Sequence, residues 1–184
     1  MLNKKNNLRR DNHSKNGNRD EFEQKVIDLA RVTRVMAGGK RMKFRACVVI
    51  GDKKGKVGIG LAKGADVSAA ITKAVSKAKK NLVQISFFHD SIMFEVREKF
   101  KAALILLKPA PKGTGVKAGG AVRIILELCG LPNVVAKILG SNSKINNAQA
   151  TINALKRFND EKYKISVDTK KVSSSTKLDE PSIK

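Results

Sequence analysis

The sequence contains few aromatic residues and few acidic ones. Phe, Trp and Tyr make up 4% of the 184 residues, and Trp is absent. Proteins that bind single-stranded nucleic acid stack the bases on aromatic rings, so this class is disfavoured. Only 16 residues are Asp or Glu, against 38 Lys and Arg, which gives a formal net charge of +22. Self-repulsion of this size disfavours a free globular protein and predicts a permanent polyanionic partner.

Cysteine and histidine are too scarce to form a metal site. Cys47 and Cys129 lie far apart and lack the spacing of zinc ligands, which is typical of small core residues in a reducing compartment. The two histidines, His13 and His89, have no cysteine cluster beside them. We therefore expect no metal and no cofactor. Three glutamates are expected to form ion pairs with Lys or Arg rather than a catalytic carboxylate pair: Glu95, Glu98 and Glu127.

Long apolar runs are also missing. The first twenty residues hold no apolar stretch of the kind found in secretory signals. The longest strongly apolar run, residues 102–107, is too short to cross a bilayer. We therefore expect no membrane association. The basic start of the chain leaves an organelle presequence open, although this segment is rich in Asn rather than Ser.

The cations that are present favour folded RNA as the partner. Lys and Arg release counterions when they neutralise phosphates, and the scarcity of rings favours recognition by shape. One basic cluster surrounds a Gly-Gly turn, where glycine allows close approach of the backbone to phosphate and Arg can bind phosphate with two hydrogen bonds. A charged face that meets only solvent is the alternative, but few acidic residues interleave here. The predicted RNA-binding residues of this cluster are Arg31, Arg34, Gly38, Gly39, Lys40, Arg41, Lys43 and Arg45.

The chain divides into four segments by composition. The two ends are polar and charged, and they cannot bury enough apolar surface to offset the entropy of ordering. The expected segments are a disordered basic arm at residues 1–20, compact units at 22–85 and 86–158, and a flexible tail at 159–184.

In the first unit, Asp20 is expected to cap a short helix whose apolar side includes Phe22, Val26, Ile27, Leu29 and Ala30. A short extended run at 32–36 leads to the Gly-Gly turn. Alternating residues predict strands at 41–50 and 56–61, joined by a hairpin turn. Apolar residues at three- and four-residue spacing predict a helix over 67–82. Helices on one face of a sheet would close this unit.

The second unit is expected to contain strands at 92–96, 102–107 and 133–139, and helices at 120–129 and 145–158. With the first unit, this makes the chain an α+β protein. Outside the Gly-Gly cluster, the lysines of the first hairpin could bind RNA or serve only solubility, and both readings stay open. The further candidate RNA-binding residues are Lys53, Lys54, Lys56, Lys63, Lys112, Lys117 and Arg123.

A glycine-rich loop at residues 109–120 is the one place for a possible enzymatic site. Pro109, Gly113 and Gly115 reproduce the spacing of the phosphate loop of small-metabolite kinases, but Val116 and Lys117 replace its Ser pair. A Walker A loop also needs Gly-Lys-Ser/Thr, which is absent here. A small-metabolite kinase therefore remains only as a disfavoured alternative, and we expect no enzyme.

Five segments, in this order, resemble the universal family of small-subunit ribosomal protein five, over roughly residues 22–158. They are RVTRVMAGGKRMKF (31–44), VVIGDKKGKVGIG (48–60), KGTGVKAGGAVR (112–123), GLPNVVAKILGS (130–141) and INNAQATINAL (145–155). The resemblance implies a double-stranded-RNA-binding-like domain at about 22–85, followed by a two-layer α/β domain of the type shared with those kinases.

The resemblance also implies a structural role in the small ribosomal subunit. It implies binding to ribosomal RNA, contacts with ribosomal proteins four and eight, and a place near the messenger entry path. Contributions to decoding accuracy and to head–body conformation follow, with a cytoplasmic, ribosome-bound location and an organelle ribosome left open. A free-standing duplex-RNA chaperone or regulator is the alternative, but it leaves the second domain unexplained.

Overall fold

The computed structural model describes residues 22–85 and 90–158. The predicted arm at 1–20, the predicted tail at 159–184 and both histidines lie outside the described residues. The first part forms an antiparallel sheet of order β1-β2-β3-β4, with one helix between the last two strands. Its elements are β1 (Glu23–Met36), β2 (Gly39–Gly51), β3 (Lys56–Gly64), α1 (Val67–Lys80) and β4 (Leu82–Gln84).

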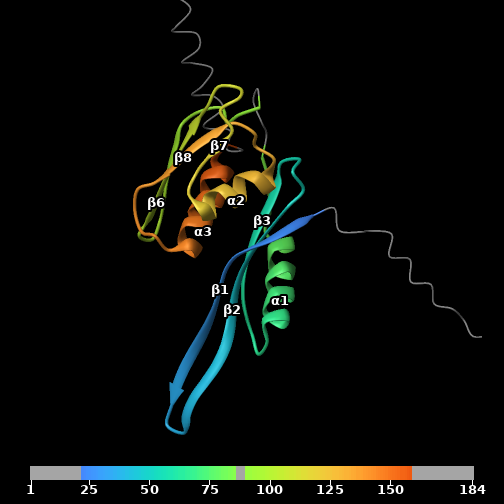
Figure 1. Cartoon of the computed structure of the whole chain (residues 1–184), viewed down its shortest axis with the longest axis vertical. Coiled ribbons are helices and arrows are strands. Elements are labelled where there is room, and N and C mark those ends of the chain that lie inside the picture. Colours follow the sequence, from blue (N-terminus) through green and yellow to red (C-terminus); the bar gives the residue numbers. More distant parts are fainter. Residues whose placement is uncertain (1–21, 86–89, 159–184) are drawn as a thin grey trace, which may run out of the picture.

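The second part forms a sheet of order β5-β6-β8-β7, in which only the short β7–β8 pair is parallel. Its elements are β5 (Val96–Phe100), β6 (Ala103–Pro109), β7 (Val116–Lys117), α2 (Gly120–Cys129), β8 (Val134–Ile138) and α3 (Lys144–Arg157). The predicted α+β class is confirmed. Figure 1 shows the two sheets with α2 and α3 between them and a long β1–β2 hairpin that extends away from the body.

The helix predicted after Asp20 is wrong, because the chain from Glu23 onward belongs to β1. The register of β1 against β2 shifts between Val26 and Asp28, which marks a β-bulge at Ile27. Because of the extra residue, Val26 and Leu29 lie three positions apart on the same face of the strand, opposite Val48 and Ala46. This spacing imitates the period of a helix.

The strand predicted at 92–96 is also misplaced, because β5 covers Val96–Phe100. Ile92 is buried in the core without belonging to a long strand. The strand itself has three consecutive charged residues, of which Glu98 is directed inward, and the apolar residues before it were the stronger signal. The short strands β4 and β7 were not predicted.

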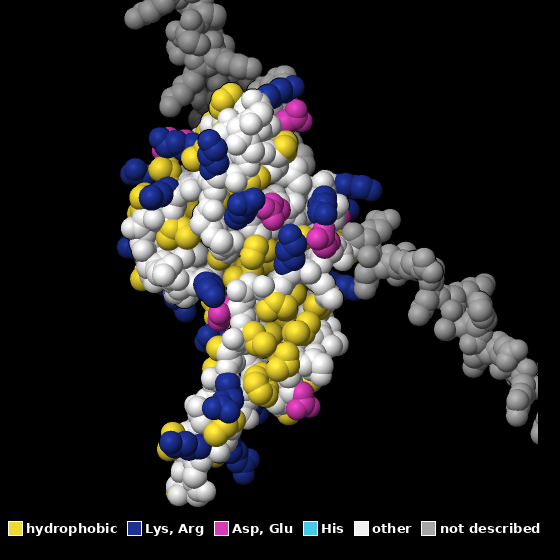
Figure 2. Space-filling model, viewed as in Figure 1, with side chains coloured by type: hydrophobic (Ala, Val, Ile, Leu, Met, Phe, Trp, Pro, Cys, Tyr) yellow, Lys and Arg dark blue, Asp and Glu magenta, His cyan; other side chains and the backbone are white. Residues whose placement is uncertain are grey.

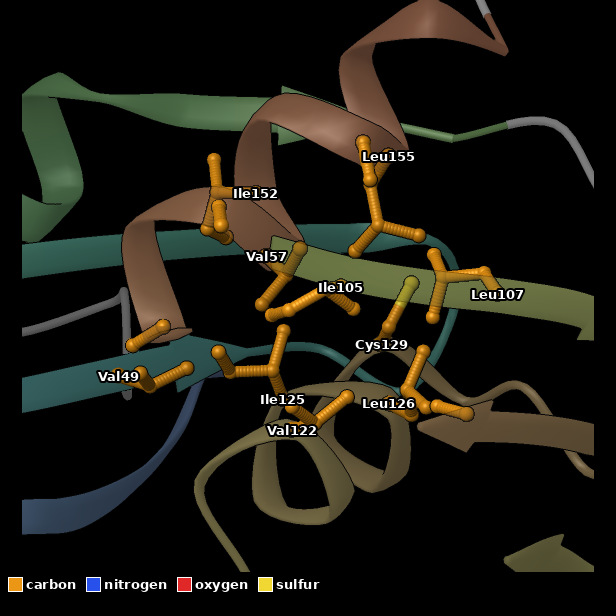
Figure 3. Close-up of a cluster of buried hydrophobic side chains, with 14 of the residues drawn as sticks. Val49, Val57, Ile105, Leu107, Val122, Ile125, Leu126, Cys129, Ile152 and Leu155 are labelled. Atoms are coloured by element: carbon orange, nitrogen blue, oxygen red, sulfur yellow. The ribbon is translucent and has the colours of Figure 1, made fainter. Parts of the chain in front are cut away.

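The central strand β2 is covered on both faces. Ala46, Val48 and Ile50 pack against α1 in one core cluster. The alternate residues Cys47 and Val49 belong to the main cluster, which they share with the second sheet and its helices. Figure 3 shows Val49 and Val57 of the first sheet meeting side chains of α2, α3 and β6. The predicted arrangement with helices on one face is therefore incomplete, since α2 and α3 cover the other.

Helix α1 packs closely on β3 because both surfaces carry small residues. Of the predicted apolar stripe, only Ala70, Ala74 and Ala78 are buried. A Cβ atom built on Gly60 would lie 1.9 Å from the carbonyl oxygen of Ala74. The helix therefore lies at a distance from the strand that only glycine permits.

The turn between β2 and β3 is fixed to the end of α2. The backbone amides of Lys53 and Gly55 donate hydrogen bonds of 3.0 and 2.9 Å to the carbonyl oxygens of Leu128 and Cys129. Gly130 ends the helix with a φ of +88°, and a Cβ built there would lie 2.1 Å from the carbonyl oxygen of Lys53. The two parts of the chain thus contact each other through backbone as well as through side chains.

Burial of the two cysteines predicts slow reaction with thiol reagents. Desolvation raises the pKa of the Cys47 thiol to about 11 and that of Cys129 to about 12. At pH 8 we expect 5,5′-dithiobis(2-nitrobenzoate) to modify both thiols rapidly in denaturant. In the native chain we expect both thiols to react much more slowly. Absorbance at 412 nm follows the reaction, and the variants Cys47→Ser and Cys129→Ser assign each signal. Rapid reaction of native thiols would contradict the buried core.

Candidate nucleic-acid interface

The β1–β2 hairpin carries the basic cluster predicted from the sequence. Its strands pair without interruption from Arg31 and Phe44 to Met36 and Gly39 at the tip. All residues from 33 to 43 are exposed. Figure 2 shows Lys and Arg side chains around this end of the molecule, with no acidic side chain beside them on the face in view.

The register of the hairpin divides the predicted cations between two faces. Residues that are paired across two strands point to the same side of the sheet. Arg34 pairs with Arg41, Val32 with Lys43 and Ala30 with Arg45, which places these cations on the face shared with Cys47 and Val49. Arg31 pairs with Phe44 and Val35 with Lys40, so these two cations lie on the opposite face. The six residues are therefore not one surface.

One of these faces forms a shallow hollow of about 350 Å³. Lys63 of β3 joins it, because Lys63 pairs with Arg45 across β2. The lining residues are Val32, Thr33, Arg34, Met36, Arg41, Lys43 and Lys63. We call the four cations of this hollow, Arg34, Arg41, Lys43 and Lys63, the cationic hairpin face.

Two of these cations oppose each other directly. Arg34 and Arg41 are register partners on neighbouring strands, and like charges in such positions destabilise a sheet. No acidic residue lines the hollow. A polyanion bound here would remove this repulsion.

Arg45 has a different position from the other predicted residues. Its guanidinium lies 3.5 Å from the carboxylate of Asp28, and the side chain is 32% exposed. Asp28 also pairs with Lys144 at the start of α3, at 3.8 Å. Arg45 thus helps to join the base of the hairpin to the second part of the chain.

The lysines of the β2–β3 turn lie on a segment with a structural role. The Asp52 carboxylate accepts hydrogen bonds from the backbone amides of Lys54 and Lys56, at 2.7 and 2.8 Å. Lys53 forms an ion pair with Glu23, and the turn contacts α2. The side chains of Lys54 and Lys56 are exposed, so their role in RNA binding stays a prediction.

The amides of Gly113 and Gly115 in the glycine-rich loop already have a hydrogen-bond acceptor within the chain. The side-chain oxygen of Asn133 accepts hydrogen bonds from the backbone amides of Gly113 and Gly115, at 3.1 and 3.2 Å. Both glycines have a positive φ, of 87° and 73°. The loop is therefore a turn arranged around a buried asparagine, which removes the basis for the kinase alternative.

Two of the three cations predicted around this loop have acidic partners. Lys112 lies 3.4 Å from Asp90, and Arg123 lies 2.7 Å from Glu127 on the same helix. The hydrogen bond from Arg123 lowers the pKa of the Glu127 carboxyl, and a weaker one from Lys25 acts in the same direction. Lys117 is exposed on β7.

The expectation that the glutamates form ion pairs is confirmed. Glu95 lies 3.2 Å from Lys108, Glu98 lies 2.6 Å from Arg157, and Glu127 contacts both Arg123 and Lys25. Within residues 22–85 and 90–158, no group of three metal-ligating side chains comes together. None of the helices in these ranges is long and apolar enough to span a bilayer.

Sequence reasoning missed several cations that the second sheet aligns. Arg97 and Lys99 on β5 and Lys137 on β8 are exposed. The sequence carries no clear signal for β5, because Glu98, the middle one of three consecutive charged residues, is directed inward to its ion pair with Arg157.

The fold and the charge together indicate the class of protein. The chain is a small, basic α+β protein with a cationic surface on an extended hairpin, which is typical of the RNA-binding structural proteins of ribosomes. Residues 22–86 match the family described as "Ribosomal protein S5, N-terminal domain", and residues 98–167 match "Ribosomal protein S5, C-terminal domain". The two matches together cover more than half of the chain.

Relatives of known identity agree with these matches. The chain is 47% identical over 148 residues to "Small ribosomal subunit protein uS5c" of Emiliania huxleyi, covering 80% of this chain and 93% of the relative. It is 48% identical over 138 residues to "Small ribosomal subunit protein uS5" of Campylobacter jejuni, covering 75% of this chain and 94% of the relative. The chain belongs to the ribosomal protein S5 family, whose members are structural proteins and not enzymes.

Proposed function

We propose that this chain is a component of the small ribosomal subunit that binds folded ribosomal RNA by neutralising phosphates. The contact residues are the cationic hairpin face, with Gly38 and Gly39 at the hairpin tip and Arg31 and Lys40 on the reverse side. The observation that carries this proposal is the direct opposition of Arg34 and Arg41 in a hollow whose lining includes no acid. This pair lowers the stability of the free protein and gains favourable interactions only when an anion binds.

The proposal includes the partners that the family resemblance implies. The chain would contact ribosomal proteins four and eight, lie near the messenger entry path, and contribute to decoding accuracy and to the conformation of the head against the body. An extended hairpin suits this role, because it can reach into RNA while the rest of the protein stays outside. Arg45, Lys53, Lys112 and Arg123 remain candidates for RNA contact, but each would share its charge with the carboxylate that it already contacts.

The salt dependence of RNA binding tests this proposal. The full chain is titrated with transcribed small-subunit ribosomal RNA at several salt concentrations. Each neutralised phosphate contributes about −0.7 to −0.9 to the slope of log affinity against log salt. We expect a slope of about −3 or steeper, since the hairpin face alone offers four cations. A flat dependence would contradict phosphate binding.

Sedimentation of cell lysate separates a ribosomal component from a free-standing RNA chaperone. The chain is expected in the small-subunit fraction, and its depletion is expected to impair assembly of that particle. Accumulation in the particle-free fraction, with normal assembly after depletion, would favour the chaperone.

A further inference from the structure

The second sheet has one face that α2 and α3 do not cover. Arg97 pairs with Leu106, and Leu106 pairs with Lys137, so these three side chains lie in one row on the same face. Two neighbouring rows lie on either side. One contains Lys99 and Leu104, and the other contains Lys108, Val135 and Lys117. We call this surface the open sheet face: Arg97, Lys99, Leu104, Leu106, Lys108, Lys117, Val135 and Lys137.

The helices pack on the other side. Ala103, Ile105 and Leu107 alternate with the residues of the open face on β6, and all three are completely buried. On β5, Glu98 points the same way and forms its ion pair with Arg157 of α3. The sheet is thus a two-layer structure with α2 and α3 on one face and side chains of the other face directed outward. Figure 2 shows Lys and Arg along the left margin of the upper body, where Figure 1 places β6 and β8.

All charged side chains of the open sheet face are cationic. It carries five Lys or Arg side chains, and the acid beside it, Glu95, pairs with Lys108 at 3.2 Å. Among the described residues, Arg97, Lys99, Lys117 and Lys137 have no acidic partner. Four exposed positive charges on one side of a small sheet are therefore unneutralised.

Strand geometry places these charges close enough to act together. Residues two positions apart on a strand are separated by about 7 Å, and strands two places apart by about 10 Å. Both distances are close to the Debye length of about 8 Å at physiological salt. Neighbouring charges therefore overlap in potential along the face, which attracts an extended anion more strongly than a small one.

The composition of the face selects among nucleic-acid ligands. Sheets that bind single-stranded RNA place aromatic side chains on the open face to stack bases. Here Phe100 alternates with Lys99 and packs against the core, and the floor of the open face is aliphatic: Leu104, Leu106 and Val135. Such a surface can neutralise phosphates but cannot stack bases. A hollow of about 470 Å³, lined in part by Lys117 and Lys137, continues the surface at its β7–β8 edge.

We propose that the open sheet face is a second RNA-binding surface, which binds the phosphodiester backbone of a folded RNA without reading its sequence. This inference rests on the proposed function, and it adds a separate contact surface on the second sheet. The chain would then bind RNA through two cationic surfaces, one on the hairpin and one on the open sheet face.

The variant Arg97→Gln/Lys137→Gln in the full chain tests this surface. Both side chains are exposed and flank Leu106, so the substitutions leave the core unchanged. With transcribed small-subunit ribosomal RNA, we expect the salt slope to become less steep by about 1.5 and the affinity to fall about 30-fold at about 0.1 M salt. The matched control, Lys73→Gln/Lys80→Gln, removes two exposed charges from α1 and is expected to change affinity less than about 3-fold.

Protection from acetylation gives a second, direct measurement. Mass spectrometry after brief acetylation should show Lys99, Lys117 and Lys137 protected by bound RNA, and Lys73 modified equally with and without it. Slow thiol modification of the double variant verifies that it is folded.

The outcomes separate this inference from the proposed function. If Arg97→Gln/Lys137→Gln binds RNA like the α1 control while variants of the hairpin face lose affinity, the open sheet face is not an RNA surface and the proposed function stands. If neither surface matters for RNA binding, the proposed function fails with it. If the double variant retains RNA affinity but no longer retains a purified ribosomal protein on an affinity column, the face binds protein and the inference is overturned.

Discussion

Replacement of the four cations of the hairpin face by glutamine is expected to lower RNA affinity about 1,000-fold at about 0.1 M salt. Each phosphate contact contributes a factor of about 5 to 8 at this concentration, because counterion release follows the logarithm of the salt concentration. Arg34, Arg41, Lys43 and Lys63 line one hollow and can act on the same stretch of backbone. The measurement is a titration of the full chain with transcribed small-subunit ribosomal RNA.

Matched pairs in the same hairpin show which face binds. Two double variants each remove two exposed charges, from opposite faces of the hairpin: Arg34→Gln/Arg41→Gln and Arg31→Gln/Lys40→Gln. We expect about a 30-fold loss for the first pair and a clearly smaller loss for the second. The first pair should also raise the free energy of unfolding by about 0.5 kcal/mol, because a repulsive cross-strand contact is removed. Equal losses would show that the face was assigned wrongly.

Substitution of Gly130 by alanine is expected to destabilise the fold by about 3 to 5 kcal/mol. Two costs combine at this position. The left-handed backbone, with φ +88°, disfavours any side chain, and the new Cβ would lie 2.1 Å from the Lys53 carbonyl oxygen. The clash is with backbone, so the β2–β3 turn must move away from α2 and lose its hydrogen bonds. Urea unfolding followed by circular dichroism measures the change.

Gly113→Ala is a closely matched control. Gly113 has nearly the same φ, +87°, but a Cβ there meets nothing within 4 Å. Alanine at this position bears only the conformational cost of about 1 to 2 kcal/mol. The difference between the two variants therefore isolates the contact between the turn and the helix. If both lose the same stability, this contact contributes nothing.

Most elements could be predicted because their hydrophobic period is unbroken. Strand β3 and the first half of β2 alternate in sequence, and α2 ends at a glycine that adopts the left-handed conformation expected there. The first strand could not be predicted, because the bulge at Ile27 replaces a spacing of two with a spacing of three. The fifth strand was masked by the more apolar residues before it. In both places the tertiary pairing, not local periodicity, decides the structure.

The location of the basic cluster was predicted from the sequence, but its division between two faces of the hairpin was not. Net charge and the Gly-Gly turn identify the hairpin, since both are properties of the sequence. The separation of Arg34 and Arg41 from Arg31 depends on strand register, which a single strand does not specify. The partnership of Arg45 with Asp28 and Lys144 depends on contacts between distant elements. The outward cations of the second sheet were missed because β5 was misplaced.

The burial of β2 on both faces has a consequence for how the chain is made. Translation delivers β1, β2, β3 and α1 before any residue of α2 or α3 exists. Until α2 and α3 have been synthesised, the side chains of Cys47 and Val49 are exposed to solvent on this face of the sheet. The nascent chain therefore passes through a stage in which one face of this sheet is apolar and uncovered.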